Sequence, residues 1–295
     1  MDIQWYPGQM AKAKRLLREN LKLVDAVIEV LDARIPYSSR NPDIRDLIER
    51  RPVVAVLTRA DLADPEATSV WIQALSKDYF AAAAVNANSG MGVKKLLSIL
   101  NKIPQRRQRS RRPLRLMVVG IPNVGKSSLI NRLLGRSAAI TGDKPGVTKG
   151  KQWLRLAGNL ELMDTPGLLW PKISSKRQAF ALAAVGAVKD EIYDPVELAL
   201  ELAAYFQASA PKNLQQRYKL SSVQGEARLL LEEIGRRRGC LSKGGEIDLE
   251  QAARLFIKDF REARLGRLTL EQVGEIGENN EQFCENDGSG NQPLP

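Results

Sequence analysis

Histidine is absent from all 295 residues of this chain. Its absence excludes the chemistry that usually depends on imidazole at neutral pH: general-base catalysis by histidine, Ser-His-Asp triads and the common zinc sites. Any reaction must therefore rely on carboxylates, hydroxyls, amides, lysine, backbone dipoles or a bound metal.

Cysteine and long apolar runs are also scarce. The two cysteines, Cys240 and Cys284, provide no disulfide framework. The longest apolar run, Ala179–Val188, has ten residues and is far too short for a membrane helix. Residues 1–7 lack the charged and apolar regions of a signal peptide. We therefore expect a cytoplasmic protein without a membrane partner.

The charge of the chain is strongly positive and uneven. It has 45 basic and 34 acidic residues, a net charge of +11. Six of the acids and none of the bases lie in residues 271–295, so residues 1–270 carry +17. Such a surplus favours a polyanionic partner, above all nucleic acid, over a merely soluble basic surface. We expect residues 271–295 to form an acidic, disordered tail.

Apolar patterning divides the rest into two domains, residues 1–173 and 174–270. In the first, strand-like apolar runs alternate with helical stretches, which favours a parallel sheet covered on both faces. A basic connection at 105–112 is either a solvated linker or a segment that contacts phosphates. The second domain shows only helical patterns. The expected strands are Ala26–Leu31, Pro52–Leu57, Ala81–Val85, Leu114–Val119, Gln152–Leu156 and Asn159–Met163, and the expected helices are Met10–Leu23, 41–50, 65–79, 92–102, 129–134, Arg177–Lys189, Val196–Ala208, Gly225–Arg238 and Leu249–Leu265.

Residues 120–128, Gly-Ile-Pro-Asn-Val-Gly-Lys-Ser-Ser, fit the pattern Gly-x-x-x-x-Gly-Lys-Ser. The pattern follows a predicted strand and precedes a helical stretch, a context that indicates a phosphate-binding loop rather than a chance match. Backbone N–H groups at the helix N-terminus would hold polyphosphate oxygens, and Lys126 would add a positive charge. The residues expected at the phosphates are Asn123, Val124, Gly125, Lys126, Ser127 and Ser128, with Ser127 also a ligand of Mg²⁺.

Two further segments would complete a triphosphate site. The motif Asp164-Thr-Pro-Gly167 follows a predicted strand, so Asp164 can hold Mg²⁺ through water and the Gly167 N–H can meet the terminal phosphate. A glycine-rich segment, 141–148, lies where a nucleotide-sensing loop is expected. Thr148 is the first choice there for a magnesium ligand and Thr141 the second, although the segment also fits an ordinary loop.

Signals for a base lie upstream of the phosphate loop. Residues 58–61, Thr-Arg-Ala-Asp, follow a predicted strand where guanine-binding proteins carry Asn-Lys-x-Asp. The Asp61 carboxylate would accept from the guanine N1–H and exocyclic amine. Each motif alone also fits a helix cap, but the ordered spacing of this motif and a second base-contacting turn predicts guanine binding. The expected base-site residues are Thr58, Arg59, Ala60, Asp61, Asn86 and Ala87.

The motifs therefore run from base motif to phosphate loop, whereas the phosphate loop comes first in Ras-like GTPases. The chain resembles the ribosome biogenesis GTPase A family of circularly permuted GTPases, bacterial factors for assembly of the large ribosomal subunit. The matching stretches, spread over roughly residues 3–270, include Ile3–Gly8, Asp32–Pro36, Ser39–Pro42, Gly120–Ser128, Asp164–Gly167, Trp170–Lys172, Gly239–Leu241 and Gly266–Leu268.

The resemblance implies an α/β fold: a circularly permuted Ras-like P-loop GTPase domain with a mostly parallel sheet, then a small all-α RNA-binding domain. It implies GTP hydrolysis that is slow alone and stimulated by ribosomal particles, with Mg²⁺ and with K⁺ held through Asn123. The implied partner is the precursor of the large ribosomal subunit, through its rRNA and ribosomal proteins. The implied catalytic residues of the phosphate end are Lys126, Thr148 and Gly167.

Two positions depart from the family pattern. Thr58 and Arg59 replace the asparagine and lysine of the base motif, and the lost amide contacts predict guanine binding weakened by about 1–3 kcal/mol. Gln9 stands where family members carry the histidine of Pro-Gly-His-Met. Glutamine is no general base at neutral pH, but it can orient an attacking water. Gln9 is thus either a catalytic residue of that kind or a polar residue of an RNA-contacting segment.

Three functions are consistent with these features. The first is a GTP-driven switch in late assembly of the large subunit, which binds preribosomal RNA when GTP orders the segments carrying Thr148 and Asp164. The alternative is an RNA-binding assembly factor whose nucleotide site has decayed, as the changes at Thr58, Arg59 and Gln9 would suggest. An ATP-using P-loop enzyme is the third, and Asp61 speaks against it.

Overall fold

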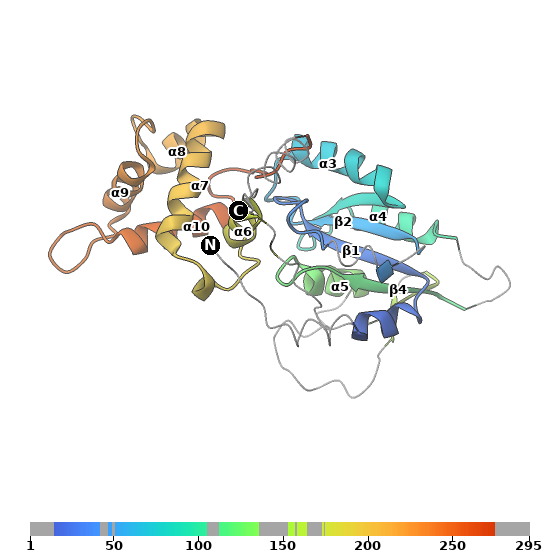
Figure 1. Ribbon diagram of the computed structural model, residues 1–295. Coiled ribbons are helices and arrows are strands. Elements are labelled where there is room, and N and C mark those ends of the chain that lie inside the picture. The colour runs from blue at the N-terminus through green and yellow to red at the C-terminus, as the bar shows by residue number, and fades with distance from the viewer. Residues whose placement is uncertain are drawn as a thin grey trace, which may run out of the picture.

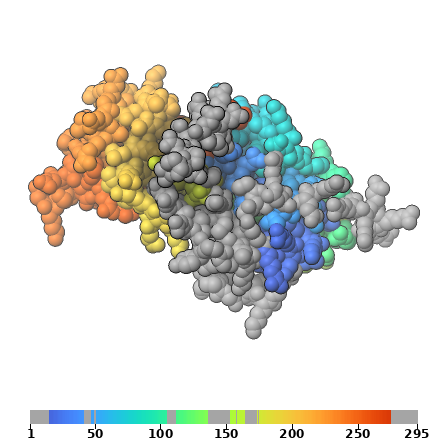
Figure 2. Space-filling model, viewed as in Figure 1, coloured from blue at the N-terminus to red at the C-terminus, as the bar shows by residue number. Residues whose placement is uncertain are grey.

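The computed structural model describes residues 15–41, 47–48, 51–104, 112–135, 153–156, 158–163, 173 and 175–274. Within this part of the chain, the residues up to 163 form a sheet domain and residues 175–267 form a helical domain (Figure 1). In the space-filling view the helical domain lies at the left and the sheet domain at the right (Figure 2). The predicted α/β fold with a following all-α domain is confirmed.

The centre of the sheet domain is a six-stranded sheet. All neighbouring strands are parallel except the last pair, β6 (Leu160–Met163) and β5 (Trp153–Leu156), which is antiparallel. The inner strands are almost entirely apolar and buried, as expected for parallel strands covered on both faces. In spatial order the strands are β3 (Ala81–Val85), β2 (Val53–Thr58), β1 (Ala26–Asp32), β4 (Leu114–Val119), β6 (Leu160–Met163) and β5 (Trp153–Leu156).

Helices cover both faces of this sheet. On one face, α3 (Pro65–Asp78) packs Trp71 and Leu75 against alternate residues of β1 and β2, and a helical segment at 15–21 packs beside β1 and β4. On the other face lie α4 (Val93–Asn101) and α5 (Lys126–Leu134). The start of α3 is set by Asp64, whose carboxylate accepts from the Ala67 N–H at 2.7 Å.

The helical domain is built around one long helix, α7 (Pro195–Ser209). The Phe206 ring of α7 meets Phe256 and Phe260 of α10 (Leu249–Arg261) edge-on, with centroids 6.1 and 6.0 Å apart. Polar contacts close the domain at α8, where Arg217 donates to the Asp259 carboxylate at 2.8 and 3.0 Å. Its described elements are α6 (Lys176–Ala184), a 3₁₀ turn (Asp190–Ile192), α7 (Pro195–Ser209), α8 (Pro211–Tyr218), α9 (Ala227–Arg238) and α10 (Leu249–Arg261).

After α10 the chain returns to the sheet domain beside α3 (Figure 1). In this return segment, residues 268–271, the Leu270 N–H donates to the Arg34 carbonyl at 2.8 Å. The Glu271 carboxylate accepts from the N–H groups of Tyr37 at 2.7 Å and Ser38 at 3.1 Å, and its carbonyl accepts from the Trp71 indole. Composition grouped Glu271 with the acidic tail that the sequence predicts to be disordered. Instead Glu271 is buried, and two backbone donors satisfy its carboxylate.

Candidate nucleotide site

The phosphate loop lies at the carboxyl end of β4, between this strand and α5. Because β1, β2, β3 and β4 are parallel, their carboxyl ends share one edge of the sheet. The structure therefore brings the predicted base motif after β2 and the second base turn after β3 to the same edge as the phosphate loop. Ligands of open α/β sheets bind at this edge.

The backbone of the loop needs glycine at two places. At Gly120 (φ +148°) a Cβ atom would lie 2.5 Å from the Val30 carbonyl oxygen, so no side chain fits. Gly125 (φ +91°) caps α5 and is packed against Thr58. Since glycine offers no side-chain acceptor to the first turn of α5, an anion can take the N–H groups there.

Lys126 and Ser127 begin α5. The Lys126 ammonium folds back and donates to the Ile121 carbonyl, and burial lowers its pKa to about 8. Ser127 is exposed and offers a hydroxyl oxygen, the hard donor that Mg²⁺ prefers. In the described ranges no three His, Cys, Asp or Glu side chains gather as a metal site. Gln9, Thr148, Asp164 and Gly167, the other predicted catalytic and magnesium residues, lie outside the described residues.

Thr58 and Arg59, the two departures in the base motif, both contact the phosphate loop. The buried Thr58 hydroxyl lies within hydrogen-bond reach of the Val124 carbonyl and, at 2.9 Å, of the Leu31 carbonyl. The Arg59 guanidinium donates to the Asn123 carbonyl at 2.7 Å. The motif thus supports the loop from β2.

The remaining base-site residues lie at the ends of β2 and β3. Asp61 is half-buried and Ala60 is buried. The Asn86 side chain accepts from the N–H groups of Asn88 at 2.8 Å and Ser89 at 3.1 Å, which closes the second base turn. The Ala87 carbonyl in this turn accepts from Arg132 of α5. Arg132, which sequence reasoning did not single out, therefore ties the turn to the helix of the phosphate loop.

A buried ion pair adjoins the loop at the end of β1. Arg34 is fully buried and donates twice to the Asp32 carboxylate, at 2.9 and 2.7 Å, and Arg59 donates to the same carboxylate at 3.3 Å. Burial raises the pKa of Asp32, but the two guanidinium groups lower it more, so the pKa stays below its ordinary value. In the sequence this motif is recognisable only as part of the family resemblance, which assigns it no role.

The helical domain also reaches the loop. The side-chain amide of Asn123, the predicted potassium ligand, donates to the Gly186 carbonyl just after α6 at 3.3 Å. The guanidinium of Arg34 donates to the Val185 carbonyl at 3.4 Å. The candidate nucleotide site thus lies directly beside the junction of the two domains.

This fold and site define a P-loop GTPase with permuted motif order. A family model described as "50S ribosome-binding GTPase" matches residues 115–218. Proteins named "Ribosome biogenesis GTPase A" are 41% identical in Priestia megaterium, over 93% of this chain and 98% of that protein, and 31% identical in Thermotoga maritima, over 93% and 96%. A solved structure titled "Crystal structure of GNP-bound YlqF from T. maritima" aligns with a TM-score of 0.64 at 29% identity, over 88% of this chain and 98% of that one.

The chain belongs to the ribosome biogenesis GTPase A family. It is therefore a GTPase with a role in ribosome biogenesis, GTP is its substrate, and Mg²⁺ is the metal that typically accompanies GTP in such enzymes. Across the part of the chain that the structure describes, none of the helices has the length and apolar character to cross a membrane.

Proposed function

We propose that this protein is a cytoplasmic, nucleotide-controlled switch in late assembly of the large ribosomal subunit, acting on preribosomal RNA. The observation that carries the proposal is the direct contact between the phosphate loop and the helical domain, through Asn123 and the Gly186 carbonyl. A change at the nucleotide phosphates is therefore adjacent to the domain that the family resemblance assigns to RNA binding.

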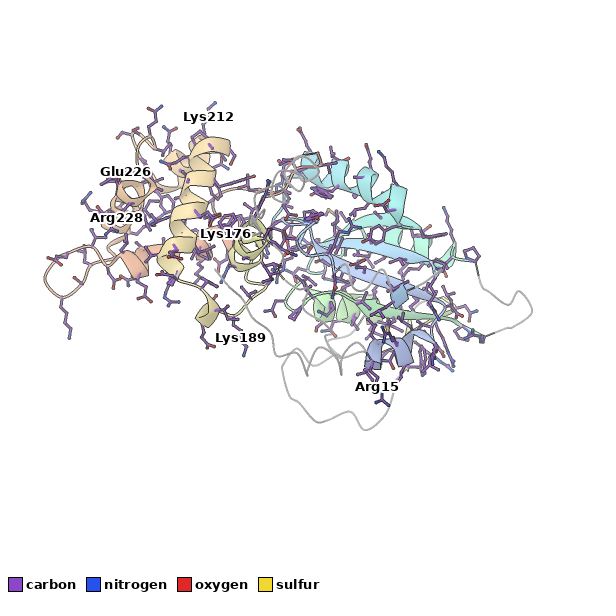
Figure 3. The ribbon with its side chains drawn as sticks, viewed as in Figure 1. Arg15, Lys176, Lys189, Lys212, Glu226 and Arg228 are labelled. Atoms are coloured by element: carbon purple, nitrogen blue, oxygen red, sulfur yellow. The ribbon has the colours of Figure 1, made fainter. Side chains whose placement is uncertain are left out.

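The charge distribution supports RNA contacts from both domains. Residues 1–173 contain 29 bases and 15 acids, a net charge of +14, whereas residues 174–270 contain 16 bases and 13 acids. In the helical domain, Lys212 lies at the top and Arg228 lies on the side away from the sheet (Figure 3). Three consecutive arginines, 236–238, end α9. A phosphate backbone would thus contact the helical domain at its outer side. It would contact the sheet domain because that domain carries the larger surplus of positive charge.

The hydrolytic centre that we propose combines residues of the described phosphate loop with residues that lie outside the described part of the chain. Ser127, Thr148 and Asp164 hold Mg²⁺, Asn123 binds K⁺, and Lys126 and the Gly167 N–H contact the terminal phosphate. Gln9 orients the attacking water when a ribosomal particle is bound. The hard oxygen donor of Ser127 and the left-handed loop backbone at Asn123 (φ +58°) support this arrangement.

One set of assays tests the switch. GTP and ATP hydrolysis by the full chain would be measured with and without precursors of the large subunit, in potassium and in sodium. We expect slow GTP hydrolysis that the particles stimulate and that potassium favours, with Lys126→Ala as the inactive control. Absence of stimulation would contradict the proposed switch, and equal rates in sodium and in potassium would contradict the proposed K⁺ site. If Gln9→Ala kept full stimulation, Gln9 would have no catalytic role.

A competition experiment tests the base preference. Asp61 retains the carboxylate that reads guanine, whereas Thr58 and Arg59 are engaged with the phosphate loop. We therefore expect GTP to displace labelled GDP at far lower concentration than ATP does. Equal displacement by ATP would show that this chain does not read the base through Asp61.

A further inference from the structure

The carbonyl groups at the end of α6 accept hydrogen bonds from side chains of both domains. The last carbonyls of a helix have no partner further along it and form its negative end. Arg261 of α10 donates to the carbonyls of Ala183 at 2.8 Å and Ala184 at 3.1 Å. The Val185 carbonyl accepts from Arg34 and Arg59, and the Gly186 carbonyl accepts from Asn123.

Arg34 and Arg261 are fixed partners of this carbonyl cluster. The Arg34 side chain is buried against Asp32 and lies 5.8 Å from the Phe260 ring centroid, and it also donates to the Arg261 carbonyl at 3.3 Å. A fully desolvated arginine with a paired carboxylate is expensive to move. These contacts hold the end of α6 close to β1 whatever occupies the nucleotide site.

Arg59 and Asn123 are different from Arg34, because both belong to nucleotide motifs and neither side chain is buried. Arg59 lies 3.5 Å from the Val185 carbonyl, Asn123 lies 3.3 Å from the Gly186 carbonyl, and the Arg59 side chain is 34% exposed. Long, partly solvated hydrogen bonds to neutral acceptors are weaker than bonds to a charged group. A polyphosphate beside the loop would therefore compete for both donors.

We propose that Arg59 and Asn123 couple the nucleotide site to the helical domain through the Val185 and Gly186 carbonyls. When the phosphates draw these two donors, the end of α6 loses two of its partners and keeps the fixed ones, so the local stability of α6 depends on the nucleotide. By linkage, the position of α6 changes nucleotide affinity by the same factor. Arg59 is a positioning residue in this scheme, and the coupling requires no ribosomal particle.

The scheme also accounts for arginine at position 59. Its guanidinium meets three acceptors at once: the Asp32 carboxylate and the carbonyls of Asn123 and Val185. Lysine, the residue usual in the base motif, presents one compact ammonium and cannot span these three positions.

Hydrogen exchange of the full chain tests the proposal. Exchange would be measured with no nucleotide, with saturating GDP and with a non-hydrolysable GTP analogue. In the wild type we expect nucleotide to change exchange at the amides of Val185, Gly186 and Ala187, which close the end of α6. In Arg59→Lys, saturated with nucleotide, this change should shrink about fivefold or more, the size of a typical coupling, while the change at the phosphate loop persists. Arg228→Lys, an exposed change on α9, is the matched control.

Two outcomes would overturn the coupling: no nucleotide-dependent change at 185–187 in the wild type, or the full change in Arg59→Lys. Should Arg59→Lys fail to fold, Asn123→Gly provides the second variant, because glycine suits the left-handed backbone there and lacks the side-chain amide. It too should reduce the change at α6. A negative result would leave the hydrolysis assays untouched, since these depend on particles and on the chemical step.

Discussion

Binding of a nucleotide near pH 8 should be accompanied by uptake of a proton at Lys126. Burial lowers the pKa of this ammonium to about 8, whereas a polyphosphate beside it favours the charged form and raises the pKa again. The free protein therefore binds as a mixture of charged and neutral lysine, and the complex contains only the charged form. Proton uptake and nucleotide affinity are then linked.

The number of protons taken up follows from the fraction of Lys126 that is neutral before the nucleotide binds. At pH 8 about half of the unliganded sites carry a neutral lysine, so GDP binding takes up about half a proton, and at pH 7 only about a tenth. Affinity for GDP should fall about fourfold between pH 7 and pH 8.5. The free energy of unfolding of the protein without nucleotide should instead rise with pH. In the unfolded chain Lys126 has its ordinary pKa of 10.5, so the unfolded chain binds more protons than the folded chain between pH 8 and 10.5. This site therefore favours folding increasingly as pH rises through that window.

Isothermal titration calorimetry with GDP at pH 8, in two buffers of different ionisation enthalpy, measures the uptake directly. Lys126→Met removes the ammonium and reports any protons taken up by the nucleotide itself. We expect the wild type to exceed this control by about half a proton per site. Protonation of Lys126 on binding is contradicted if the wild type takes up no proton at pH 8, or if Lys126→Met takes up as many.

Three further changes test the packing around the site. Thr58→Val leaves the Leu31 and Val124 carbonyls without their buried hydroxyl donor. Urea denaturation should therefore show a loss of about 1–3 kcal/mol in unfolding free energy. An unchanged midpoint would mean that water replaces the hydroxyl. Gly120 and Gly225 both have a positive φ, but only at Gly120 would a Cβ lie against backbone, 2.5 Å from the Val30 carbonyl oxygen. Gly120→Ala should therefore lower Tm more than Gly225→Ala does, and equal losses would point to backbone strain alone. Burial raises the pKa of Glu271 to about 7, so the folded chain binds a proton more tightly than the unfolded chain does. As pH rises from about 5 to about 8, the wild type should therefore lose stability relative to Glu271→Gln. A gap that stays constant between these pH values in denaturation curves would contradict that linkage.

The strands were predictable from local pattern, and the helices only in part. Runs such as Ala26–Leu31 and Leu114–Val119 are continuously apolar because both faces of the inner sheet are covered. The helix expected at Arg177–Lys189 ends at Ala184 instead, because the chain turns at Gly186 (φ +75°) although the apolar run continues. Helix α8 was missed since only Leu214 and Tyr218 are buried along an otherwise polar segment.

In the site, the phosphate loop was predictable because its function requires a local pattern of glycines and lysine. The Asp32–Arg34 pair was not, since its partners lie at positions 59, 185 and 261, and no spacing along the chain reveals such a convergence. The burial of Glu271 was hidden for the same reason, because its donors lie more than 230 residues upstream. Composition grouped Glu271 with five other acids of residues 271–295, although its environment is that of the core.

The departures at Thr58 and Arg59 therefore call for an interpretation different from decay. A nucleotide site without function has no reason to keep a buried hydroxyl beneath Val124 or a guanidinium on the Asn123 carbonyl. Both contacts lie at the phosphate end, where a hydrolase must hold its loop rigid against a change of charge. Thr58 and Arg59 lack the side-chain amide and the ammonium of the usual base motif and contact the phosphate loop and Asp32. We expect the same two residues to weaken guanine binding and to support the phosphate loop, and a Thr58→Asn, Arg59→Lys double variant should therefore strengthen the first and weaken the second.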